Sequence, residues 1–224
     1  MISNQIPPTP PASAPSSAPA TPAPSPAGPA QPSPVDSFDA RKPETWSPLQ
    51  RHAEFFDRNQ DGRITVGETY DGLRALGVGP VRAAAFSTLI NAGLGVSTGA
   101  PWYNPLEIQV NRISAGKHGS DTGVYDADGR LDPVKFDAIF QKHDTDKDSC
   151  LNQAEVSAMI AANRTDRAGN VAAKGEFGLL MTLAGTDREH DGKTERVITR
   201  ETMERLYDGS LFYRLAGEPC PFQP

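Results

Sequence analysis

A twelve-residue segment, DRNQDGRITVGE, carries the clearest chemical signal in the sequence. Gly62 is its sixth residue, where the chain must turn sharply, and Ile64 is its eighth, where loops of this type form a short strand. Oxygen donors stand at its first, third, fifth, seventh (through the backbone carbonyl), ninth and twelfth positions: Asp57, Asn59, Asp61, Arg63, Thr65 and Glu68. This order is typical of an EF-hand, so the segment predicts a calcium site.

A second segment, DTDKDSCLNQAE, offers a similar set of donors at the same positions, again with a backbone carbonyl at the seventh: Asp144, Asp146, Asp148, Cys150, Asn152 and Glu155. Ser149 replaces the glycine of the sixth position, which strains the turn without forbidding it. Because EF-hands normally pair, a second loop is expected structurally. Two interpretations stay open: a second calcium site, or a partner loop that binds no metal.

Helices are predicted on both sides of the first loop. Apolar residues recur there at helical spacing, and a glycine follows as a stop signal: Leu49, Ala53 and Phe56 upstream, then Tyr70, Leu73, Leu76 and Gly77. His52 is unusual among them, because its position in an entering helix normally holds an apolar side chain.

Two further segments resemble degenerate calcium loops. The stretch YDADGR has acidic residues at the third and fifth positions, but Val124 falls at the first and Lys135 at the twelfth, where a cation would repel calcium. In the last segment Ile198 is expected at the eighth position of a hand, and a surface loop around residues 188–194 lengthens that hand. We expect no metal in the first of these, and the ligands of the second do not fall at the correct spacing.

Composition limits the classes of function. The chain has 224 residues and a formal net charge of −6, which argues against nucleic-acid binding. Its two cysteines, Cys150 and Cys220, imply no disulfide framework. We find no run of about 18 apolar residues, so a conventional transmembrane helix is not expected.

The predicted fold is mainly α, built from EF-hand helix–loop–helix units. Residues 1–43 are rich in Pro, Ala and Ser and are expected to be disordered, as a solvated tail or a docking arm, and they lack the pattern of a secretory signal. The domain is expected over residues 44–217, with an EF-hand at 45–77, an amphipathic segment ending in a proline turn at 80–106, a helical part at 111–217 and a tail at 218–224.

The segment at 80–106 has two open interpretations. One face of its expected helix carries Ala85, Phe86, Leu89, Ile90, Gly93 and Leu94, and a turn with Pro101, Trp102, Tyr103 and Pro105 follows. Such a helix with adjacent aromatic residues suits a membrane interface, but it equally suits packing on the protein's own core. Farther along, a buried helix is expected to begin near Lys174.

Together these motifs resemble the caleosin (peroxygenase) family of lipid-droplet proteins. The resemblance runs from about Pro48 to Ala216 and rests on RHAEFFD with its calcium loop, KHGSD, YDADGR, KGEFGLL and YDGSLF. The central segment is shorter and more polar than the usual family anchor, which favours peripheral association with a lipid droplet or membrane, and otherwise a cytoplasmic location.

The resemblance implies a calcium-dependent haem enzyme that transfers oxygen from a hydroperoxide to an unsaturated fatty acid or similar acceptor. Two family histidines tied to haem match His52 and His118, as axial ligand and acid–base group in an order left open. Without the resemblance, His118 reads as a histidine of a surface loop. A calcium-binding structural protein of lipid bodies and a calcium sensor or buffer are the alternatives.

Overall fold

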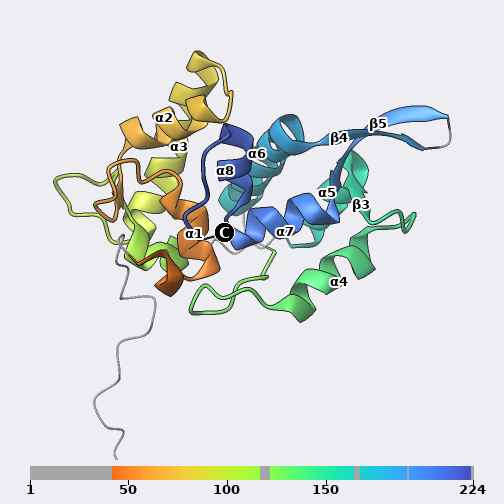
Figure 1. Ribbon diagram of the computed structural model, residues 1–224, viewed down its shortest axis with the longest axis horizontal. Coiled ribbons are helices and arrows are strands. Elements are labelled where there is room, and N and C mark those ends of the chain that lie inside the picture. The colour runs from red at the N-terminus through yellow and green to blue at the C-terminus, as the bar shows by residue number, and fades with distance from the viewer. Residues whose placement is uncertain (1–41, 117–121, 164–166, 191, 223–224) are drawn as a thin grey trace, which may run out of the picture. The chain divides into compact units, whose positions relative to one another are not determined.

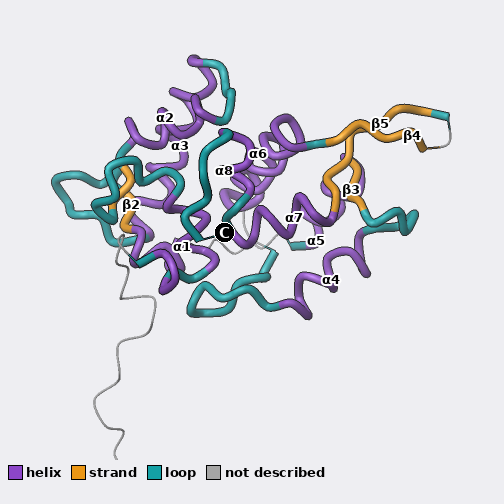
Figure 2. Tube along the Cα trace, in the orientation of Figure 1, coloured by secondary structure: helices purple, strands orange, loops and turns teal. Residues whose placement is uncertain are grey.

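The computed structural model describes residues 42–116, 122–163, 167–190 and 192–222. It confirms a mainly α-helical protein (Figures 1 and 2). Both the predicted disordered tail up to residue 41 and the KHGSD motif with His118 lie outside the described residues. The helices are α1 (Pro48–Glu54), α2 (Val66–Ala75), α3 (Pro80–Ser97), α4 (Pro133–His143), α5 (Gln153–Ala162), α6 (Arg167–Ala184), α7 (Arg200–Asp208) and α8 (Leu211–Ala216), with 3-10 helices at Pro43–Thr45 and Val110–Gly116.

Short strands join the calcium-type loops in two separate pairs. β1 (Arg63–Ile64) pairs antiparallel with β2 (Ile108–Gln109), Ile64 opposite Ile108. β3 (Cys150–Asn152) pairs with β5 (Lys193–Thr199), Leu151 opposite Ile198, and β5 pairs in turn with β4 (Thr186–His190). The two acidic loops are therefore not paired with each other, although the usual pairing of EF-hands predicted that they would be. Each pairs with a segment that lacks the calcium pattern, and Ile198 occupies the strand position expected for it.

Side-chain caps fix where the helices next to both acidic loops begin. Thr65 and Glu68 form a capping box at the start of α2, and Asn152 and Glu155 form the same arrangement at the start of α5. The predicted stop at Gly77 follows α2 and has φ +87°. The buried helix expected near Lys174 begins earlier, since α6 starts at Arg167.

The most deeply buried face of helix α3 is not its apolar face. Its fully buried residues are small or polar and recur every four residues: Ala83, Ser87, Asn91 and Gly95. Asn91 donates to the carbonyls of Ile64 (2.9 Å) and Leu106 (2.7 Å) and accepts a hydrogen bond from Thr69 (2.6 Å). Of the predicted apolar face, Phe86, Ile90 and Leu94 are half-buried and the others are exposed. Small residues let the chain approach closely here, because a Cβ on Gly95 would meet the carbonyl oxygen of Pro105 at 2.3 Å.

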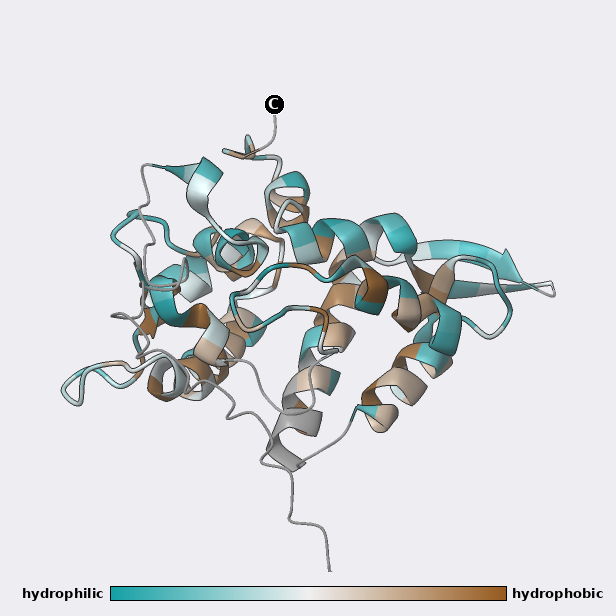
Figure 3. Ribbon diagram, turned by 90° about the horizontal axis from the view of Figure 1, so that it is seen from below, coloured by the Kyte–Doolittle hydropathy of each residue, from teal (hydrophilic) through white to brown (hydrophobic). Residues whose placement is uncertain are grey.

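The main hydrophobic core lies between α4, α5, α6, α7 and the β3–β5 strands, with Leu151, Met159, Ile198 and Met203 at its centre. Smaller clusters lie around α1, α2 and α3. The inserted residues that lengthen the last hand form a β4–β5 hairpin, and not the surface loop expected at residues 188–194. Its outer part is hydrophilic and exposed (Figure 3). Among the described residues, no helix combines the length and the hydrophobicity needed to cross a membrane.

Candidate functional site

The first acidic loop, between α1 and α2, is ordered by its own candidate ligands. Asp57, only 2% exposed, accepts hydrogen bonds from the amides of Asp61 (3.1 Å) and Gly62 (2.8 Å). At the other end Glu68 accepts from the amide of Thr65 at 2.9 Å. The first and twelfth ligand positions are therefore both fixed by backbone donors.

Negative charge is concentrated in this loop. Burial, with a smaller contribution from the carboxylates of Asp61 and Glu68, raises the pKa of Asp57 to about 6, although the two amide hydrogen bonds act in the opposite direction. The side-chain oxygen of Asn59 also lies at the loop interior, where it accepts from the amide of Asp61 at 2.9 Å. A divalent cation would offset this crowding of carboxylates, and the seventh-position carbonyl of Arg63 completes the donor set.

The second acidic loop, between α4 and α5, repeats the same hydrogen bonds. Asp144 accepts from the amides of Asp148 (3.1 Å) and Ser149 (2.9 Å), as Asp57 does in the first loop. The amide of Asn152 donates to Glu155 at 3.0 Å, as that of Thr65 does to Glu68. The three aspartates of this loop bring carboxylate oxygens within 4.8 Å of one another. The candidate ligands of the second loop thus have nearly the arrangement of the first.

The backbone turn is also shared. The sixth position is left-handed in both loops, with φ +84° at Gly62 and φ +63° at Ser149, and so is the fourth, at Gln60 and Lys147. A serine tolerates this conformation at a cost of roughly 1 kcal/mol that glycine avoids. The predicted strain at Ser149 is therefore present, and the turn forms despite it.

A cavity of about 300 Å³ lies between α1, α2, α3, α6, α7 and α8. Its walls are mostly apolar. The face of α1 predicted from helical spacing supplies Leu49, His52 and Ala53, and Phe56 follows just after the end of the helix. His52 packs edge-on against Phe212, with ring centroids 4.7 Å apart. A half-buried imidazole thus stands in the wall of a large, mainly apolar space.

Hydrogen bonding fixes the tautomer of this imidazole. Nδ1 of His52 lies 3.0 Å from the carbonyl oxygen of Leu206 in α7. A carbonyl only accepts, so Nδ1 carries the proton and Nε2 keeps a lone pair in the neutral ring. Burial lowers the pKa of His52 below its ordinary value, although the Leu206 carbonyl and the charge of Glu176 act in the opposite direction. The neutral, ligand-competent form is therefore favoured.

Hydroxyl groups mark another part of the cavity wall. The hydroxyls of Thr122 and Tyr207 lie 2.8 Å apart, and Tyr125 donates to the backbone carbonyl of Tyr207 at 2.8 Å. Sequence reasoning missed these residues, although Tyr207 opens the YDGSLF motif. It also missed Leu206, which acts through its backbone carbonyl and leaves no side-chain signal.

Comparisons with known proteins identify the family. The sequence profile described as "Caleosin related protein" matches residues 44–216. A protein named "Peroxygenase" from Lilium longiflorum is 38% identical over 82% of this chain and 76% of its own. "Probable peroxygenase 4" from Arabidopsis thaliana is 39% identical over 77% of this chain and 87% of its own.

A further Arabidopsis thaliana relative, 31% identical over 64% of this chain and 67% of its own, is named "Probable inactive peroxygenase-like protein". No solved structure matches the chain significantly. The profile match and the two relatives close to 40% identity cover most of the described domain. The chain belongs to the caleosin family.

Proposed function

We propose that this protein is a calcium-dependent haem peroxygenase, which transfers an oxygen atom from a hydroperoxide to an unsaturated fatty acid or a similar acceptor. The observation that carries the proposal is His52, whose Nδ1 donates to the Leu206 carbonyl at 3.0 Å in the wall of an apolar cavity. The names of the two peroxygenase relatives described above support the same class of reaction.

The cavity residues fit haem. Proteins commonly hold haem iron through a neutral imidazole whose second nitrogen donates to a backbone carbonyl or carboxylate, and His52 has this arrangement. Aliphatic and aromatic walls suit a flat apolar ring, and among them Phe56 and Leu183 line the cavity. When bound, haem would supply the redox chemistry that oxygen transfer requires.

The surrounding residues would hold and orient the reactants. The apolar wall would exclude water and accept an acyl chain, while the paired hydroxyls of Thr122 and Tyr207 give that wall a polar point beside which an oxygen atom of a reactant could lie. His118 precedes Thr122 by four residues in the sequence. We assign it to haem or to proton transfer on the hydroperoxide.

Calcium would act through α1. The helix ends at Glu54, whose carbonyl accepts a hydrogen bond from the amide of Asp57 at 2.8 Å, and the loop ligands follow directly. A cation held by Asp57 and Glu68 would therefore fix the end of the helix that carries His52. Removal of calcium should loosen haem and lower activity.

The test is an optical titration of the purified full-length chain with haem, with and without calcium. We expect a Soret band characteristic of ligated haem, which His52→Ala and His118→Ala each change. His190→Ala, an exposed histidine on the hairpin, is the matched control and should leave the band as in the wild type. The proposal fails if the wild type takes up no haem, or if both His52→Ala and His118→Ala leave the spectrum unchanged.

A second candidate is a calcium-binding protein that associates with lipid surfaces without haem chemistry. Large apolar side chains of α3 and the following turn favour it, since they point to solvent: Val81 (82% exposed), Val96 (71%), Trp102 (90%) and Tyr103 (71%). We propose that this surface makes the peripheral contact with a lipid droplet or membrane in either case. Colourless protein that floats with lipid vesicles would select the second candidate.

A further inference from the structure

We propose that the β4–β5 hairpin and the second acidic loop together form a site for a transition-metal ion, with Zn²⁺ as the best match. Its protein ligands are Asp146 from the loop, His190 from β4 and Glu195 from β5. Their ligand atoms all lie within 4.8 Å of one another. This site is separate from the cavity and does not depend on the proposed peroxygenase function.

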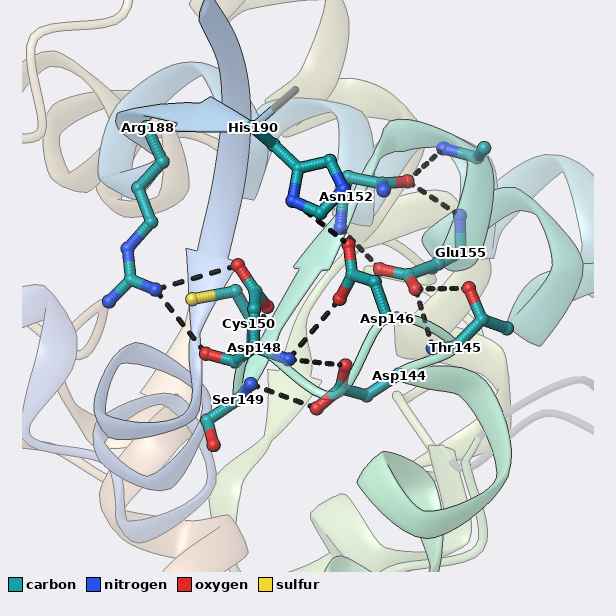
Figure 4. A network of polar contacts seen from close by, with 11 residues as sticks. Asp144, Thr145, Asp146, Asp148, Ser149, Cys150, Asn152, Glu155, Arg188 and His190 are labelled. Carbon is teal, nitrogen blue, oxygen red and sulfur yellow. Dashed lines mark hydrogen bonds and ion pairs between the residues drawn. The ribbon is translucent and has the colours of Figure 1, made fainter. Parts of the chain in front are cut away.

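Strand register places both hairpin ligands on the side that faces the loop. Arg188 lies directly opposite Glu195 and His190 opposite Lys193, so the side chains of Arg188, His190 and Glu195 share one face of the hairpin. Contacts identify that face. Arg188 lies 3.5 Å from the carboxylate of Asp148, and Figure 4 shows Arg188 and His190 both directed toward the loop.

Distances suit an ion between the ligands. Nδ1 of His190 lies 3.8 Å from Oδ2 of Asp146, which is too long for a hydrogen bond. Two ligands of a tetrahedral zinc ion, each about 2.0 Å from the metal, stand about 3.3 Å apart. A small rotation of exposed side chains would close that difference, since the side chains of Asp146 and His190 are 22% and 42% exposed. The same exposure gives the ion a path from solvent.

The donor set distinguishes this site from the calcium loops. Calcium takes oxygen ligands, whereas imidazole nitrogen with carboxylates suits zinc and its neighbours in the transition series. Three protein ligands leave a fourth position for water. The guanidinium of Arg188 is directed to Asp148, so it does not occupy the position of the ion. Bound metal would cross-link the hairpin to the loop through Asp146.

Isothermal titration of the metal-depleted full-length protein with zinc chloride tests the site. We expect one zinc ion per wild-type chain at this site, and at least tenfold weaker binding in His190→Ala and in Glu195→Gln, because even outer-sphere changes at metal sites typically cost 10- to 100-fold. Glu189→Gln is the matched control. It removes the same charge next to His190 on the opposite face of the hairpin and should change zinc affinity less than twofold.

Three results would overturn the proposal: no zinc uptake by the wild type, wild-type affinity in His190→Ala, or an equal loss in Glu189→Gln and Glu195→Gln. The last result would show general attraction by negative charge instead of ligation. An unchanged calcium isotherm and circular dichroism spectrum in His190→Ala and Glu195→Gln would show that loss of zinc does not come from misfolding.

Discussion

Gly209, in the YDGSLF motif, ends α7 against the helix that carries His52. Its φ is +87°, in the left-handed region that favours glycine. A Cβ at this position would lie 2.6 Å from Cβ of Arg51 and 2.7 Å from the backbone nitrogen of His52. Most of these neighbours are backbone atoms, so they cannot move aside without shifting α1. Gly209→Ala should therefore destabilise the fold and displace the imidazole.

The magnitude follows from two costs. A residue other than glycine in the left-handed region destabilises the folded state by about 1–2 kcal/mol. Overpacking of a tight contact destabilises it by a further amount of about 1–3 kcal/mol. We expect Gly209→Ala to lower the free energy of unfolding by about 2–5 kcal/mol. Gly217 is the matched control: its φ is +69°, and no described atom lies within 4 Å of an added Cβ. Gly217→Ala should show the conformational cost alone.

Equilibrium urea denaturation at one fixed free calcium concentration measures both variants, because bound ligand shifts apparent stability. Gly209→Ala should lose about 1–3 kcal/mol more than Gly217→Ala. It should also alter the haem spectrum, whereas Gly217→Ala should not. Equal losses in the two variants would refute the close contact between Gly209 and α1.

Three further predictions concern buried polar groups and calcium. Asp57→Asn combined with Glu68→Gln should remove the calcium site of the first loop, and calorimetry that finds the same number of bound ions as in the wild type would contradict the assignment. Burial raises the pKa of Glu54 to about 7, so wild-type stability in chelator should fall as pH rises from about 4.5 to 7, by up to about 3 kcal/mol. Glu54→Gln, which can still accept from Tyr213, should remove the part of that slope due to Glu54 and leave the part due to Asp57, whose pKa is also raised, and an unchanged slope would rule out Glu54 as a source. Asn91→Ala should lower the free energy of unfolding by roughly 2–4 kcal/mol, because it leaves two carbonyls and a hydroxyl without their partner. A decrease of less than about 1 kcal/mol in the same denaturation assay would argue against that network.

The sequence predicted local features well because local spacing determines them. The left-handed turns of the two acidic loops, the stop at Gly77 and the α1 face that lines the cavity all follow from residue order within one or two turns of chain. The helix-capping pairs follow from the same short spacing. Even the strained turn at Ser149 was predicted correctly, since the loop requires a left-handed residue at that position whichever side chain stands there.

Long-range pairing was harder to predict. β2, the partner of β1, carries no ligand pattern, so the sequence offered the second acidic loop as the more obvious partner. Hydrophobicity alone did not decide which face of α3 is buried, because it suited a membrane interface and the protein's own core equally. Close approach of the chain near Gly95 and the hydrogen bonds of Asn91 favour small and polar residues on that face. The hairpin was not predicted because β4 and the outer residues of β5 are charged and exposed, without the apolar alternation that marks a strand.

The imidazole of His52 is positioned by both acidic-loop units, the one paired through β1 and β2 and the one paired through β3 and β5. Its helix, α1, leads directly into the first acidic loop. The Leu206 carbonyl that orients its Nδ1 belongs to α7, which follows β5, and β5 pairs with the strand of the second acidic loop. Contacts between α1 and α7 join the two halves at this residue. A change in either loop thus has a direct structural route to the same ring, through its backbone on one side and its hydrogen bond on the other. This arrangement gives the second loop a part in positioning His52 even if it binds no metal, because β3 still fixes β5 and, through it, the start of α7.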